Sequence, residues 1–149
     1  MSTYREHLLE GSSAVDLVVA LYDGIIRFLY TAADAVDRGD VQARRAAVKR
    51  AFDIIIHLQA RLRMDIGGSP AQALSEFYAS IFAQILQASQ SASREKFEHV
   101  IECVRNVRDA WRQVANESAF SGEVRSQSSS AIHAINDEAE HAHITSWTA

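Results

Sequence analysis

The sequence is organised around Leu21-Tyr22-Asp23-Gly24-Ile25-Ile26-Arg27-Phe28-Leu29, the centre of a helix predicted over residues 12–36. Apolar residues recur there at alternating steps of three and four, the spacing that lines up one face of an α-helix. This stripe consists of Val15, Val18, Tyr22, Ile25, Leu29, Ala32 and Val36. A second row beside it makes the stripe wider than a two-stranded coiled coil requires: Val19, Ile26 and Ala33. We therefore expect this helix to lie between partner helices.

Two local signals accompany this helix. Ser13 followed by Asp16 reads as a capping box that would begin it. Gly24 costs about 1 kcal/mol relative to alanine in a helix interior. Either a neighbouring side chain or backbone approaches closely at Gly24, or the glycine is simply tolerated.

Three further helices are predicted by the same spacing. Gly39-Asp40 ends the first helix and begins a second that continues to about Met64. Ser69 caps a third helix that ends near Ser89, and Ser93 caps a fourth. We expect each helix to span about 20 to 25 residues. The connections between them are short, and residues 87–93 are predicted to form a loop. The sequence therefore predicts an all-α, antiparallel up-down four-helix bundle over residues 1–116.

The two ends of the chain carry weaker signals. Residues 1–11 form a short N-terminal arm whose larger apolar side chains are Tyr4, Leu8 and Leu9; this arm either frays or lies in a groove of the bundle. Residues 117–149 are rich in serine and form either a tail or a weakly packed fifth helix.

Composition limits the class of protein. The chain has 149 residues, enough for one domain with a real core. It shows no signal-peptide core and no apolar run of membrane-spanning length, so we expect a cytoplasmic protein without membrane insertion. Its single cysteine, Cys103, is consistent with a reducing compartment.

The charge is unevenly distributed. Residues 40–64 contain six basic and two acidic residues, whereas residues 117–149 contain one basic and five acidic residues. No aromatic residues or nucleic-acid-binding motif accompany the basic helix face, so we expect no nucleic-acid partner. We interpret it as a solvated face that attracts the acidic tail. The face is formed by Arg44, Arg45, Lys49, Arg50, Arg61 and Arg63.

No constellation of residues indicates catalysis, so we predict a protein that is not an enzyme and that has no cofactor. The sequence lacks a phosphate-binding glycine loop, a cysteine pair for zinc and the paired Glu-x-x-His of di-iron bundles. The seam carboxylates Asp23, Asp53 and Glu76 have no histidine three residues further on. His133, Asp137 and His141 share a helical spacing that can bind a divalent metal, but in a serine-rich tail we expect solvated side chains. Cys103 lies among valines, which favours an inert buried thiol.

Four elements taken together resemble the flagellar secretion chaperone family that handles flagellin. They are Leu21-Tyr22-Asp23-Gly24 with the residues up to Leu29, the Ile54-Ile55 pair leading to Leu58 and Leu62, Met64-Asp65-Ile66-Gly67-Gly68, and Arg108-Asp109-Ala110-Trp111. The order and spacing match over residues 4–115. The resemblance implies a bundle that binds the disordered C-terminal segment of flagellin, keeps it monomeric in the cytosol and helps to deliver it to the export gate of the flagellar type III apparatus.

A client surface follows from this resemblance and from apolar residues that one core face would not use. The second helix offers Phe52, Ile54 and Ile56, and neighbouring residues Ile101 and Cys103 on the fourth helix extend the surface; Arg61 and Arg105 add polar contacts at its rim. By analogy with the family, Tyr4, Leu8 and Leu9 would occupy part of this groove until the client displaces them.

Two readings remain open beside this one. The bundle could be thick enough to cover the surplus apolar residues of the second helix. The chain could also be a structural or adaptor bundle whose acidic tail binds another protein or its own basic second helix.

Overall fold

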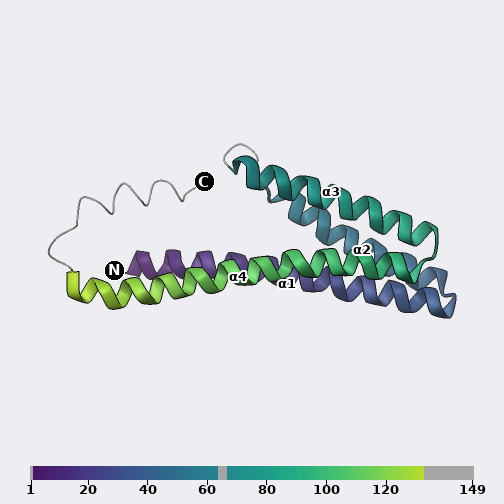
Figure 1. Cartoon of the computed structure of the whole chain (residues 1–149). Coiled ribbons are helices and arrows are strands. Elements are labelled where there is room, and N and C mark those ends of the chain that lie inside the picture. The colour runs from purple at the N-terminus through teal and green to yellow at the C-terminus, as the bar shows by residue number, and fades with distance from the viewer. Residues whose placement is uncertain (1, 64–66, 133–149) are drawn as a thin grey trace.

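The part of the chain that the structure describes folds into four α-helices that pack as an antiparallel bundle (Figure 1). The computed structural model describes the backbone of residues 2–63 and 67–132, and the side chains of residues 14–63 and 67–117. Helix α1 packs against α2 and α4, and α3 completes the bundle against the same two helices. The helices are α1 (Ser2–Arg38), α2 (Val41–Ala60), α3 (Gly68–Gln90) and α4 (Arg94–Ile132). The predicted all-α four-helix bundle is confirmed.

The core is built around the central stripe of α1. Tyr22, Ile25 and Leu29 are fully buried, as the three-four spacing predicts. Every other helix contributes side chains to the same cluster, among them Val48, Ala51, Ile55, Ile81, Ile85, Phe97, Val100, Ile101 and Val104. The wide stripe of α1 is therefore covered from several sides, which is the arrangement that its second apolar row requires.

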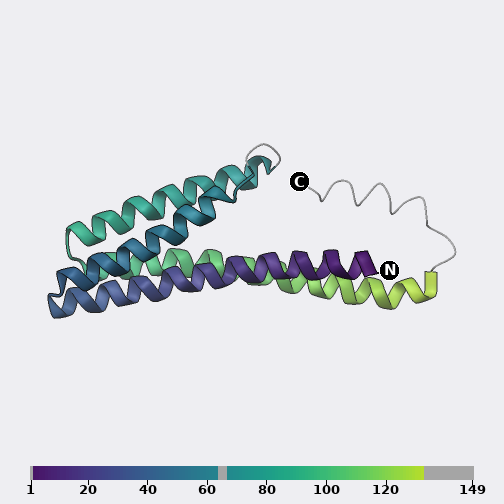
Figure 2. The same ribbon diagram turned by 180° about the vertical axis from the view of Figure 1, so that it is seen from behind.

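The helices are not equal in length, contrary to the prediction. Helices α1 and α4 have 37 and 39 residues, whereas α2 and α3 have 20 and 23. The additional length of α1 and α4 lies at one end of the bundle, where the first turns of α1 and the last turns of α4 run side by side past the α2–α3 pair (Figures 1 and 2). Each long helix supplies the other with a partner, and neither segment contains a proline that would interrupt it.

Two predicted boundaries are corrected by this pairing. Residues 2–11 are not a separate arm, because α1 begins at Ser2 and passes through Ser13 without a break. The helical signal after Asn116 is the continuation of α4 as far as Ile132 and not the start of a fifth helix. Residues 133–149 lie outside the described part of the chain.

The turn between α1 and α2 confirms its sequence signals. Gly39 has a left-handed φ of +67°, and its N–H bonds the carbonyl of Val36 at 3.0 Å while the N–H of Asp40 bonds that of Ala35 at 2.9 Å. This is the Schellman motif that glycine favours. The Asp40 carboxylate then accepts a bond from the N–H of Ala43 at 3.0 Å and so caps α2.

The remaining boundaries were predicted less well. Helix α2 ends at Ala60, before Met64, and α3 begins at Gly68 after Gly67 without a side-chain cap, so Ser69 does not cap it. The α3–α4 connection is only residues 91–93, because α3 continues to Gln90. Ser93 does cap α4, through a 3.2 Å bond from the N–H of Lys96.

Gly24 marks a close approach between α1 and α2. A Cβ atom built on Gly24 would lie 3.0 Å from Cδ1 of Ile54. That separation is at the lower limit of real carbon contacts, so the glycine lets the two helices meet here. Of the two explanations for Gly24, close approach is therefore the correct one.

Two tyrosine hydroxyls join α1 to α3 inside the core. Tyr22 and Tyr78 bond each other at 2.8 Å, with their rings edge to face at a centroid distance of 6.2 Å. Burial raises the pKa of Tyr22 above its ordinary value of 10, an effect that hydrogen bonds with Tyr78 and Trp111 oppose. Burial, reinforced by the hydrogen bond that Tyr78 shares with Tyr22, also raises the pKa of Tyr78.

The end of α3 uses a residue that is poorly suited to its backbone. Ala92 has a left-handed φ of +46°. The N–H groups of Ala92 and Ser93 bond the carbonyls of Ser89 and Ala88 at 3.1 and 3.0 Å, so this is a second Schellman motif, with alanine where glycine is usual. A Cβ atom in the left-handed region costs about 1 kcal/mol or more.

Replacing Ala92 with glycine should therefore stabilise the protein. We expect Ala92→Gly to raise the free energy of unfolding by about 0.5–1 kcal/mol in urea denaturation, because the strain is removed. The matched control is Ala83→Gly, the same change at an exposed position inside α3, which should lower it by about 1 kcal/mol. Destabilisation by both variants would show that Ala92 is not strained.

The tyrosine pair should make the stability of the protein fall at alkaline pH. Both folded-state pKa values are raised, so the folded protein holds protons that the unfolded chain releases above about pH 10. The stability that this pair contributes is fully present below that pH and is lost as the pH rises further. Urea denaturation between about pH 8 and pH 11 should show Tyr78→Phe losing less stability over this range than the parent. Equal losses would mean that the pair does not resist ionisation.

Candidate functional site

The residues that carry the family resemblance come together from α1 and α4. Arg108 of α4 donates a hydrogen bond to Asp23 at 2.8 Å and contacts its neighbour Asp109 at 3.2 Å. Arg112, one turn further on, lies 3.5 Å from the second oxygen of Asp23. The bond to Asp23 raises the pKa of Arg108, whose side chain is only 16% exposed. The ion pair between Arg108 and Asp23 ties the middle of α1 to α4.

The rest of the motif also faces other helices. Tyr22 bonds Tyr78 of α3, and Gly24 admits Ile54 of α2. Leu21 and Trp111 are partly buried against the core cluster. The Leu21–Gly24 element and Trp111 are therefore used in holding the four helices together, and they offer little surface to a partner.

The three client residues predicted on α2 do not share one face. Phe52 and Ile56 are one turn apart on the same side, and Ile56 is 57% exposed. Ile54 lies on the opposite side of the helix, where it packs against α1 at Gly24. Arg61 is exposed at the C-terminal end of α2.

The predicted residues on α4 do not extend this surface, because α2 and α4 occupy non-neighbouring positions in the bundle. Ile101 is only 2% exposed and belongs to the core, so it is closed to a client in this arrangement. Cys103 is partly exposed, and its sulfur lies 3.9 Å from His99. The prediction that its thiol is buried is therefore wrong. Arg105 donates a 2.8 Å bond to the hydroxyl of Tyr30 on α1. A single patch drawn from α2 and α4 is therefore not formed.

The structure forms a different apolar surface along the contact between α2 and α3. The rings of Phe52 and Phe82 stack at a centroid distance of 4.0 Å. Ile56 follows Phe52 by one turn on α2, and Leu86, which is 43% exposed, follows Phe82 by one turn on α3. We call these four residues the apolar strip. The matching four-residue steps were visible in the sequence, but only the fold shows that Phe82 and Leu86 face α2.

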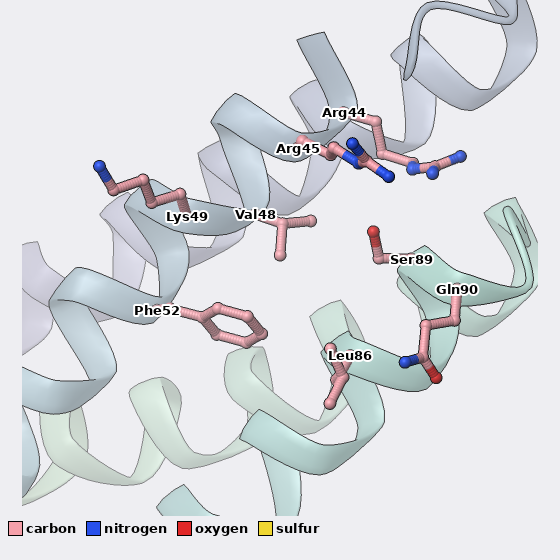
Figure 3. Close-up of a pocket in the computed structure, with 8 residues that line it drawn as sticks. All are labelled: Arg44, Arg45, Val48, Lys49, Phe52, Leu86, Ser89 and Gln90. Atoms are coloured by element: carbon pink, nitrogen blue, oxygen red, sulfur yellow. The ribbon is translucent and has the colours of Figure 1, made fainter. Parts of the chain in front are cut away.

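A groove with basic residues on one side adjoins the strip (Figure 3). It has a volume of about 470 Å³ and shares Phe52 and Leu86 with the strip. Arg44 and Arg45 stand on the α2 side, and the hydroxyl of Ser89 points from α3 toward their guanidinium groups. We call this the basic groove; it is lined by Arg44, Arg45, Val48, Lys49, Phe52, Leu86, Ser89 and Gln90.

Some predicted residues lie outside what the structure describes. The backbone at Tyr4, Leu8 and Leu9 is the start of α1, but their side chains are not described, so the N-terminal gate remains a prediction. His133, Asp137 and His141 follow the last described residue. Among the described side chains, those of residues 14–63 and 67–117, no three His, Cys, Asp or Glu are grouped so as to hold a metal ion. No helix within residues 2–63 and 67–132 is long and apolar enough to cross a membrane.

Comparison with known proteins identifies the family. The model of the family "Flagellar protein FliS" matches residues 1–118. The flagellar secretion chaperones FliS of Vibrio cholerae and Salmonella typhimurium are each 31% identical to the chain, over 73% and 77% of its length and 80% and 86% of theirs. That of Campylobacter jejuni is 30% identical over 77% of the chain and 90% of its own length. The match covers α1, α2, α3 and the part of α4 up to residue 118, including the Asp23–Arg108 contact, and the chain belongs to the FliS family of flagellar secretion chaperones.

Proposed function

We propose that the protein is a cytosolic export chaperone that binds the disordered C-terminal segment of flagellin. Binding prevents premature polymerisation of flagellin and aids its delivery to the export gate of the flagellar type III apparatus. Membership of the FliS family supports this proposal. The observation that carries it is the apolar strip, which the core leaves open on the α2–α3 pair.

The strip has the form that an amphipathic client helix requires. Its residues are spaced by one helical turn on each of two antiparallel helices, so they present a line of apolar side chains beside the basic groove. An amphipathic segment binds such a surface through residues that recur every three or four positions. Half-exposed Ile56 and Leu86 lie clear of the core cluster, so a client can cover them without opening the bundle.

The strip alone is small for a disordered partner. A segment that orders on binding loses chain entropy, and a large contact area must offset this loss. We therefore expect the client to continue past the strip, with Arg61 contributing a polar contact at the C-terminal end of α2. The predicted contacts at Cys103 and Arg105 would require the client to pass around the bundle to α4.

Calorimetric titration with a purified flagellin C-terminal segment tests the proposal. We expect 1:1 binding with a large negative heat-capacity change, because apolar surface is buried as the segment folds. Ile56→Glu should weaken binding about tenfold or more, since it places a charge in the buried contact. Val114→Glu is the matched control: Val114 is 48% exposed but lies on α4, and its replacement should leave the affinity unchanged.

Two outcomes would contradict the proposal. If the folded protein does not bind the segment, the chaperone function fails and the adaptor reading of the bundle takes its place. If binding is observed but Ile56→Glu and Val114→Glu affect it equally, the client does not use the apolar strip.

A further inference from the structure

The basic groove contains positive charge that the described part of the chain does not neutralise. No carboxylate in residues 14–63 and 67–117 forms an ion pair with Arg44, Arg45 or Lys49. The Nε atom of Arg44 is buried and makes no hydrogen bond there. A buried donor without a partner is unfavourable, and an incoming carboxylate would satisfy it. Because Val48, Phe52 and Leu86 line the same groove, the matching ligand is a peptide with both acidic and apolar side chains.

The sequence of this chain contains such a peptide. Residues 133–149 carry Asp137, Glu138 and Glu140 and no lysine or arginine. The same stretch contains large apolar side chains, namely Ile135, Ile144 and Trp147. The three carboxylates match the three cations of the groove in number and are opposite in sign.

The segment cannot place these carboxylates in the groove of its own chain. The groove lies at the end of the bundle where α4 begins, and α4 then rises about 57 Å from Arg94 to Ile132. The groove extends back from that end by about 16 Å, from Val41 to Phe52 of α2. About 40 Å along the bundle therefore separates Ile132 from the nearest part of the groove. Glu140 is eight residues beyond Ile132 and reaches at most about 29 Å when fully extended. The length of the segment therefore excludes binding to the basic groove of its own chain.

We propose that the basic groove binds the acidic segment 133–149 of a second copy of this chain. Two copies placed antiparallel bring the Ile132 end of each beside the groove of the other, as the opposite positions of the two ends allow (Figure 1). A two-fold arrangement then forms both contacts at once. The inference is independent of the proposed function, because it requires only copies of this chain.

Sedimentation of the full-length chain tests this pairing. We expect a reversible dimer that weakens as salt is raised, since its contacts are between partly exposed charges. Arg45→Glu/Lys49→Glu should weaken dimerisation about tenfold or more, as should neutralisation of the segment by Asp137→Asn/Glu138→Gln/Glu140→Gln. Arg45 and Lys49 are exposed, so the fold does not depend on them. The control Arg50→Glu/Arg61→Glu makes the same charge change at exposed positions outside the groove, one in α2 and one at its C-cap, and should have no effect on dimerisation.

Mixing the two defective variants shows whether the contact is between copies. The groove variant retains a normal segment and the segment variant retains a normal groove, so the mixture can form one of the two contacts. We expect the mixture to associate more than either variant alone. The proposal is overturned if the parent chain sediments as a single copy at all concentrations up to about 100 µM. It is also overturned if the control weakens dimerisation as much as the groove variant, or if the mixture gains nothing.

Discussion

Burial of one stripe of α1 is the constraint on which the rest of the structure depends. Tyr22, Ile25 and Leu29 are fully enclosed. Removing a large apolar side chain from water stabilises a fold by about 1.5–3 kcal/mol. Helix α1 is packed along α2 and α4, and its Tyr22 reaches α3, so every helix depends on this stripe. Because packing uses the motif residues of α1, they offer little surface to a partner, whereas the α2–α3 pair exposes both apolar and basic side chains.

The sequence predicted well those features that depend on neighbouring residues. The spacing of apolar residues located the buried stripe of α1 and the existence of all four helices. Gly39, Asp40 and Ser93 marked helix ends correctly because their preferences act within one turn of the chain. One of the two explanations for Gly24 was a close approach, although the side chain that approaches, Ile54, could not be known.

Features that depend on distant segments could not be predicted in the same way. The full lengths of α1 and α4 result from their pairing, which overrides both the Ser13 capping signal and the serine-rich composition after Asn116. Spacing along a helix says which side is buried but not which helix lies next to it. The predicted client surface therefore combined α2 with Ile101 of the core, whereas the fold joins Phe52 to Phe82.

We infer that the α1–α4 contact stabilises the fold and that the client binds the α2–α3 pair. One variant, Arg108→Gln, tests whether these two roles are separate. It removes the charged bond to Asp23 and leaves the apolar strip intact. Its affinity for the flagellin C-terminal segment should be measured together with its unfolding in urea. We expect stability to fall by about 0.5–1 kcal/mol while the affinity stays within about twofold of the parent. A tenfold loss of affinity with unchanged stability would contradict this separation of roles and place the motif in the client site.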